Sequence, residues 1–185
     1  MIDVNELRKG VTFELDGKIY KVLEYTHHKP GRGKATIRTK ARDLRNGNTI
    51  DLSFTSSDRV QDIRLEHHEV QFLYSDDEFY YFMDLGTYEQ PAIRKDVLEE
   101  YALYFKENME LKLTFFENEP LDIELPTAVD YEVTKADPAV RGDTATGVTK
   151  KVTLETGLQV DTPAFVEVGD VIRVDTRNGG YVTRV

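Results

Sequence analysis

Residues 29–42 have the sequence KPGRGKATIRTKAR. In the second half of this segment, small or apolar residues alternate with polar ones, which is the pattern of a half-buried β-strand. The alternation places Arg38, Lys40 and Arg42 on a single face of that strand. The segment therefore predicts a β-strand with one cationic face, preceded by a loop.

The loop ahead of this strand is predicted to be a tight, exposed tip. Proline fixes φ, and glycine adopts conformations that are closed to other residues. The tip consists of Lys29, Pro30, Gly31, Arg32, Gly33 and Lys34. A cationic tip backed by a cationic strand suits an anionic partner, and RNA is the first candidate. A basic hairpin turn without such a partner is the alternative that this loop alone leaves open.

Alternating patterns continue on both sides of the tip and predict a small N-terminal β-barrel. The strands expected there span residues 11–15, 18–25, 35–42 and 49–54. Asp16-Gly17 separates the first two and is a strong hairpin signal. We assign residues 1–63 to this domain.

A second domain is predicted at residues 64–126, with strands at 70–74, 79–84, 110–116 and 121–125. Between the strand pairs we expect one helix, which Asp96 caps and which ends at Asn108. Its apolar face comprises Val97, Leu98, Tyr101, Ala102 and Phe105. The order strand, strand, helix, strand, strand is typical of an OB-fold. The aromatic run Phe79–Phe82 is expected in the barrel core rather than on a base-stacking surface.

Residues 127–185 are predicted to form a third small barrel, with a long polar loop at 137–147. No clear internal repeat is found. The formal net charge of −10 is unevenly distributed. It is +3 for residues 1–63, −11 for 64–126 and −2 for 127–185. If the partner is RNA, the acidic middle domain should therefore face away from it.

The composition argues against several classes of chemistry. Because there are no cysteines, disulfides, thiolate nucleophiles and zinc–cysteine sites are excluded. We find no phosphate-binding glycine motif and no nucleophile elbow. The pairs His27-His28 and His67-His68 are adjacent residues whose side chains point to opposite faces of a strand, so no metal site is expected. With no secretory signal or apolar span, we expect a cytoplasmic protein.

Several motifs, in order along the whole chain, resemble those of bacterial elongation factor P. They are Lys29–Gly33, Phe82–Asp84 with Thr87–Gln90, Arg141–Thr144 with Leu154–Gly157, the run from Gly157 through Pro163 to Asp170, and Val174–Arg184. The resemblance implies a KOW/SH3-like barrel followed by two OB-fold barrels in an L-shaped, tRNA-like arrangement. It also implies a monomeric, non-enzymatic factor that uses no cofactor.

The resemblance further implies binding to the 70S ribosome between the peptidyl-tRNA and exit sites, and relief of stalling at consecutive prolines. Arg32 would lie against the CCA end of peptidyl-tRNA. The cations Arg38, Lys40 and Arg42 would face the backbone of tRNA and ribosomal RNA. Third-domain contacts with the small subunit and messenger would come from Arg141, Gly142, Asp143, Thr144, Tyr181 and Arg184.

Three positions depart from the family pattern. Many members carry a lysine at the tip that is extended by a modifying enzyme, and another branch rhamnosylates a tip arginine, so Arg32 is the possible modification site here. Gly86 stands where an acidic residue is usual, and we expect little consequence. Thr162 replaces the usual valine before Pro163, with an expected loss of some packing.

Two other classes of function fit the sequence less well than a ribosome-binding factor does. A general single-strand RNA-binding barrel would place exposed aromatic residues beside the basic ones, whereas the basic strand here alternates with Ala, Thr and Ile. A glycosidase would need a cleft carboxylic acid with a raised pKa, and a chain of this size without tryptophan is a poor sugar-binding scaffold. Both rank below a ribosome-binding factor.

Overall fold

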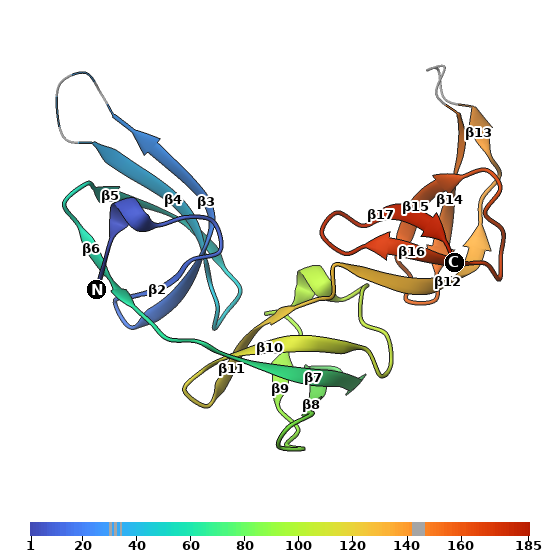
Figure 1. The fold of residues 1–185 in the computed structure, drawn as a ribbon, viewed down its shortest axis with the longest axis horizontal. Helices are drawn as coiled ribbons and strands as arrows, with labels where there is room; N and C mark the ends of the chain where they lie inside the picture. Colours follow the sequence, from blue (N-terminus) through green and yellow to red (C-terminus); the bar gives the residue numbers. More distant parts are fainter. Residues whose placement is uncertain (30, 32, 34, 142–146) are drawn as a thin grey trace.

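The computed structural model describes residues 1–29, 31, 33, 35–141 and 147–185, with only the backbone described at 140–141. The chain is almost entirely β and is organised around three antiparallel sheets (Figure 1). The described residues hold two short 3₁₀ helices and no α-helix. No helix in these ranges is long and apolar enough to cross a membrane. The predicted class, mainly β with three small domains, is confirmed.

The first domain is a curled six-stranded sheet with the order β1-β6-β2-β3-β4-β5. Its elements are β1 (Ile2–Asp3), the 3₁₀ helix η1 (Val4–Glu6), β2 (Thr12–Leu15), β3 (Lys18–His28), β4 (Thr36–Asp43), β5 (Thr49–Thr55) and β6 (Arg59–Asp62). Asp16 and Gly17 have φ of 52° and 76°, as a type I′ hairpin turn requires. The strands β1 and β6 were not predicted, because so few residues carry little alternation.

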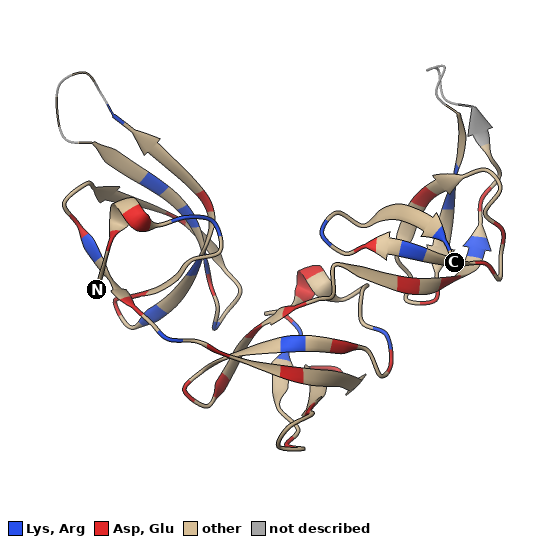
Figure 2. Cartoon of the chain, in the orientation of Figure 1, with Lys and Arg blue, Asp and Glu red and all other residues tan. Residues whose placement is uncertain are grey.

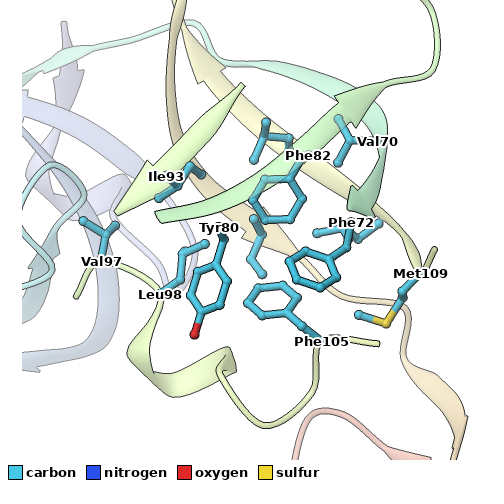
Figure 3. Close-up of a cluster of buried hydrophobic side chains, with 12 residues drawn as sticks. Val70, Phe72, Tyr80, Phe82, Ile93, Val97, Leu98, Phe105 and Met109 are labelled. Carbon is cyan, nitrogen blue, oxygen red and sulfur yellow. The ribbon is translucent and has the colours of Figure 1, made fainter. Parts of the chain in front are cut away.

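The second domain contains a five-stranded sheet with the order β11-β10-β7-β8-β9. Its elements are β7 (Glu66–Ser75), β8 (Phe79–Asp84), β9 (Ala92–Arg94), the 3₁₀ helix η2 (Glu99–Tyr101), β10 (Glu110–Phe116) and β11 (Glu119–Glu124). Pro120 lies in β11, an edge strand, where a missing backbone donor is tolerated. Figure 3 shows the core, in which the Phe105 ring stacks on Phe72 with centroids 4.9 Å apart.

The predicted α-helix over residues 96–108 is wrong. Val97, Leu98 and Phe105 enter the core as expected, but Ala102 is exposed and only η2 is helical. Successive backbone N–H groups donate three residues back rather than four, for example from Tyr101 to Leu98 at 2.9 Å. A segment this short is marginal as an α-helix, and here its carbonyl groups accept hydrogen bonds from the neighbouring domains.

The aromatic run in β8 divides between two faces. Tyr80 and Phe82 are buried in the core, as predicted. Phe79 and Tyr81 are only half-buried and lie on the other face, where Tyr81 stacks on the exposed Tyr74 with centroids 4.7 Å apart. The prediction that all four residues form core is therefore right for every second residue, as strand alternation requires.

The third domain has the strand order β13-β14-β12-β16-β17, with β15 pairing on β14. Its elements are β12 (Ala128–Ala136), β13 (Val140–Arg141), β14 (Val148–Leu154), β15 (Gln159–Pro163), β16 (Val171–Asp175) and β17 (Gly180–Arg184). Thr162 is buried, and its hydroxyl donates to the carbonyl of Lys150 at 3.3 Å. The hydroxyl at this position is thus paired within the core.

The three domains form a bent chain in which the first and third rise from opposite ends of the second (Figure 1). The boundaries proposed at 63/64 and 126/127 fall in the connections between β6 and β7 and between β11 and β12. In Figure 1, the hairpin of β3 and β4 extends beyond the rest of the first barrel. The fold therefore presents the basic hairpin at the end of one arm.

Candidate nucleic-acid interface

The basic arm, defined here as the hairpin of β3 and β4, is built from long paired strands. Register runs from Tyr20 opposite Asp43 to His28 opposite Thr36, with a bulge between Val22 and Glu24. Ile37 on β4 is fully buried in the barrel core, so the alternate residues must face outward. The arm is therefore anchored by one face and offers the other to a partner.

Two of the three predicted strand cations are available on the outer face. Arg38 and Lys40 are exposed, and among the described residues neither forms an ion pair. Lys29, at the end of β3, is exposed as well. His27 and His28 are exposed residues at the end of this strand. The side chains of Lys29, Arg38 and Lys40 are suited to contacts with phosphate groups.

Arg42 has a different role from the other two cations. Its side chain is only 11% exposed, pairs with Glu100 and donates to the carbonyl of Val97, both in the second domain. Burial alone lowers the pKa of Arg42, but the hydrogen bond and charge of Glu100 outweigh burial and raise it above its usual value. Arg42 is a domain-joining residue, so we do not retain it as an RNA contact.

The predicted tip is only partly described. Gly31 and Gly33 are exposed, and Gly33 has φ of +123°, a conformation that favours glycine. The site residues Pro30, Arg32 and Lys34 lie outside the described residues, as do Gly142, Asp143 and Thr144 of the third domain. Their assigned roles remain predictions.

Most of the charged residues of the central domain are acidic (Figure 2). Some of them form ion pairs with the first domain, for example Asp122, which is buried and pairs with Lys21 at 2.6 Å. Most of the other acidic residues are exposed, and they form an anionic surface that would repel an RNA backbone. Nucleic-acid binding is thus better supported by the basic arm than by this OB-fold.

The histidines of the central domain engage different partners. His67 lies 3.1 Å from the Thr114 hydroxyl, whereas His68 Nδ1 lies 2.5 Å from Asp84 Oδ2. The hydrogen bond to Asp84 raises the pKa of His68. Among the residues that the structure covers, no cluster of His, Cys, Asp or Glu could hold a metal ion. The pairing of His68 with Asp84 was not predicted, because their spacing carries no local signal.

The third-domain residues named from the sequence are not gathered into one exposed cluster. Tyr181 is half-buried and packs against the domain core. Arg184 is exposed, lies 3.5 Å from Asp170 and covers the ring of Phe165 at 5.2 Å from its centroid. Arg141 lies in the short strand β13. Only Arg184 therefore offers a charged group that the structure places at the surface.

A short repeat at the two domain joints was not predicted from the sequence. Residues 43–47 (DLRNG) and 175–179 (DTRNG) share the pattern Asp-x-Arg-Asn-Gly. Each forms a turn that faces residues 96–104 of the central domain, since a Cβ at Gly47 would lie 3.2 Å from the Asp96 carbonyl oxygen and one at Gly179 would lie 2.9 Å from the Tyr104 hydroxyl. A search for repeats as short as five residues would have found them.

Comparison with solved structures supports the fold. The chain is similar to the eukaryotic translation initiation factor 5A from Methanococcus jannaschii, with a TM-score of 0.52 and 19% identity. That similarity covers 67% of this chain and 91% of the other.

Family models match all three domains. The elongation factor P (EF-P) KOW-like domain matches residues 3–60, its OB domain residues 65–123, and the elongation factor P C-terminal model residues 129–184. Curated relatives named "Elongation factor P" include those of Moorella thermoacetica, 44% identical over 184 residues, and Caldanaerobacter subterraneus, 45% identical over 185 residues. In both cases the alignment covers 100% of each chain. The chain therefore belongs to the elongation factor P family of translation factors.

Proposed function

We propose that this translation elongation factor binds the 70S ribosome between the peptidyl-tRNA and exit sites and relieves stalling at consecutive prolines. The observation that carries the proposal is family membership over the full chain, combined with an exposed basic arm. It catalyses no covalent step itself. It holds the reacting ends in place, and restricting their motion lowers the entropic part of the barrier.

The bent arrangement supports a contact at each end of the molecule. The basic arm of the first domain faces peptidyl-tRNA and ribosomal RNA, with Lys29, Arg38 and Lys40 near their phosphates. The third domain, through the loop from Arg141 to Thr144 and through Tyr181 and Arg184, faces the small subunit. The acidic central domain is directed away from RNA. The factor acts as a monomer in the cytoplasm.

The tip supplies the contact closest to the reaction. Its central residue, Arg32, lies against the CCA end of peptidyl-tRNA, and it is the residue that a tip-modifying enzyme would decorate. A guanidinium stays protonated at physiological pH, so it remains a cation whether modified or bare. Lysine-type extension is ruled out by the same chemistry.

The test is translation of a reporter with three consecutive proline codons in a purified system, with and without the protein isolated from its native host. We expect the protein to relieve the stall. The Arg32→Ala variant should keep its fold and ribosome binding but lose most of the relief. Intact mass of the native sample reports whether Arg32 is modified.

Three outcomes would count against the proposal. Full relief by Arg32→Ala would refute the tip assignment. Ribosome binding by the native protein without stall relief would refute the proline function. Failure to bind ribosomes would favour a general RNA-binding protein instead.

A further inference from the structure

The outer face of the first barrel consists of three cross-strand rows over β3, β4 and β5. The rows are Glu24–Lys40–Asp51, Thr26–Arg38–Ser53 and His28–Thr36–Thr55, from the barrel toward the tip. Residues opposite each other in adjacent antiparallel strands lie within about 4.5–5.5 Å at their Cβ atoms. Each row is therefore a set of direct neighbours.

The three rows differ in charge. In the row of Lys40, two exposed carboxylates flank one ammonium group, so the row carries a net charge of −1. In the next row, Arg38 stands between two hydroxyl groups, and the charge is +1. The row nearest the tip contains two threonines and a histidine. Arg38 is consequently the one uncompensated cation of these nine residues.

The first two rows line a shallow pocket of about 410 Å³. Arg38, Thr26 and Ser53 form one end of it, and Glu24, Lys40 and Asp51 form the other. A guanidinium presents a planar set of donors that matches two phosphate oxygens, and hydroxyls donate to the same group. The pocket thus has an end that suits an anion and an end that repels one.

We propose that Arg38, Thr26 and Ser53 form a binding site for a single phosphate of an RNA backbone, closed on the barrel side by Glu24 and Asp51. The site rests on the proposed function and names the chemistry of its first-domain contact. Because the acidic row blocks the barrel side, the RNA backbone crosses the strands at Arg38 and continues toward the tip. Lys40 offsets one of the two carboxylates of its row and is not part of this site.

The test measures equilibrium binding of the full-length protein to ribosomes stalled at consecutive prolines, over a series of salt concentrations. The decisive variant is Arg38→Lys, which keeps the charge but loses the two-pronged geometry. We expect it to weaken binding by about tenfold, since hydrogen bonds to charged groups are the strong ones. Arg38→Ala should weaken binding further and reduce the salt slope by about one.

Three further variants test the boundaries of the site. Ser53→Ala should weaken binding by about threefold. Asp51→Asn should strengthen it, because it removes an acid from the closed end. Arg59→Ala is the matched control, an exposed arginine on β6 of the same domain, and should leave affinity unchanged.

If the Arg38→Lys variant binds ribosomes as tightly as the wild type does, the phosphate site is refuted and a diffuse field of positive charge is favoured. Weaker binding by Asp51→Asn would overturn the closed end. If either result accompanies normal stall relief by the wild-type protein, the phosphate site fails while the proposed function stands. If the wild-type protein does not bind stalled ribosomes, both fail.

Discussion

Residues 43–47 and 175–179 form nearly the same turn at two different domain joints. In each, the arginine N–H donates to the aspartate carboxylate at 2.9 Å, and the glycine N–H donates to the aspartate carbonyl at 2.8 Å. Gly47 and Gly179 have φ of 75° and 71°. The shared sequence therefore produces one backbone conformation twice.

The surroundings of the two turns differ. Around the first, Ile19 and Leu44 pack against Leu121 of the central domain. Cross-domain ion pairs of Lys21, Arg42 and Arg45 surround this apolar cluster. Around the second, Arg177 folds back on its own Asp175 instead of reaching across.

The second joint combines hydrogen bonds, one cross-domain ion pair among the described residues, and the half-buried Val129, which packs against the cores of both domains. The buried Tyr131 donates its hydroxyl to the carbonyl of Tyr104 at 2.6 Å, and Lys106 pairs with Glu155 at 2.9 Å. The apolar cluster at the first joint contains three almost fully buried side chains from two domains, whereas the apolar contact across the second joint comes from a partly buried valine, so burial stabilises the first joint more. We therefore expect the first joint to hold its angle more firmly than the second.

The largest effect is expected from Leu121→Ala, which empties the centre of the first joint. Leu121 is 2% exposed, and truncating a buried leucine costs about 2–5 kcal/mol of unfolding free energy. In urea, the first domain of the variant should unfold at a lower concentration than it does in the wild type, because it is released from the second domain. Small-angle scattering should report a wider distribution of shapes.

Leu113→Ala is the control for that variant. Leu113 is fully buried within the central domain's own core. It should lower stability by a similar amount while leaving the angle between the first two domains unchanged. Equal scattering changes for both variants would contradict the role assigned to Leu121.

A smaller effect is expected from Arg42→Met, compared with Arg45→Met. Arg42 is mostly buried, so its loss leaves the Val97 carbonyl unpaired and should cost about 1.5–3 kcal/mol. Arg45 forms an exposed ion pair with Glu119, so its loss should cost less than about 1 kcal/mol. Chemical denaturation of the two variants gives the comparison, and the reverse order would refute it.

Alanine substitutions at the glycines of the two turns should distinguish the cost of backbone strain from the cost of a steric clash with the central domain. Both Gly47→Ala and Gly179→Ala incur about 1–2 kcal/mol for a left-handed conformation. At Gly47 the new Cβ meets backbone, which cannot move aside, whereas at Gly179 it meets the end of a tyrosine side chain. Gly47→Ala should therefore cost more.

The double variant Gly179→Ala with Tyr104→Phe tests the contact directly. Removing the hydroxyl relieves the crowding, so thermal unfolding of the double variant should occur above that of Gly179→Ala alone. A purely additive loss of stability would indicate that the contact has no energetic role.

The smallest effect concerns His68, which lies inside the central domain and serves as a reference for both joints. Its pKa is raised by the hydrogen bond to Asp84, so its contribution to stability is present below the unfolded pKa of about 6.5 and is lost as pH rises through the folded value. The melting temperature should fall over that range in the wild type. His68→Gln should show a weaker dependence, and an unchanged pH profile would rule out the pair as its source.

Much of the fold was accessible from local sequence. Alternation in residues 35–42 predicted which face of β4 is buried, and Asp16-Gly17 predicted the turn between β2 and β3. The prediction that failed was the α-helix at residues 96–108. Its apolar residues Val97, Leu98 and Phe105 are buried as predicted. The carbonyl groups of Val97 and Tyr104, however, accept hydrogen bonds from other domains. Local propensity cannot anticipate partners that are distant in sequence.

The candidate site divides in the same way. Sequence placed Arg38, Lys40 and Arg42 on one strand face, because side chains alternate along any strand. Only tertiary contacts distinguished them. The pairing of β3, β4 and β5 placed Lys40 between two acids and Arg38 between two hydroxyl groups, whereas packing against the central domain brought Arg42 to Glu100.

Sequence by itself thus determined the elements whose conformation depends on near neighbours: the alternating strands, the glycine turns, and the family to which the motifs belong. Tertiary structure alone decided which of the described cations form no ion pair, how two similar turns build unlike joints, and that a segment with a helical pattern forms only a short 3₁₀ helix. The physical reason is the distance along the sequence over which each interaction acts. Backbone preferences act over a few residues, whereas charge pairing and burial depend on groups that only folding brings together.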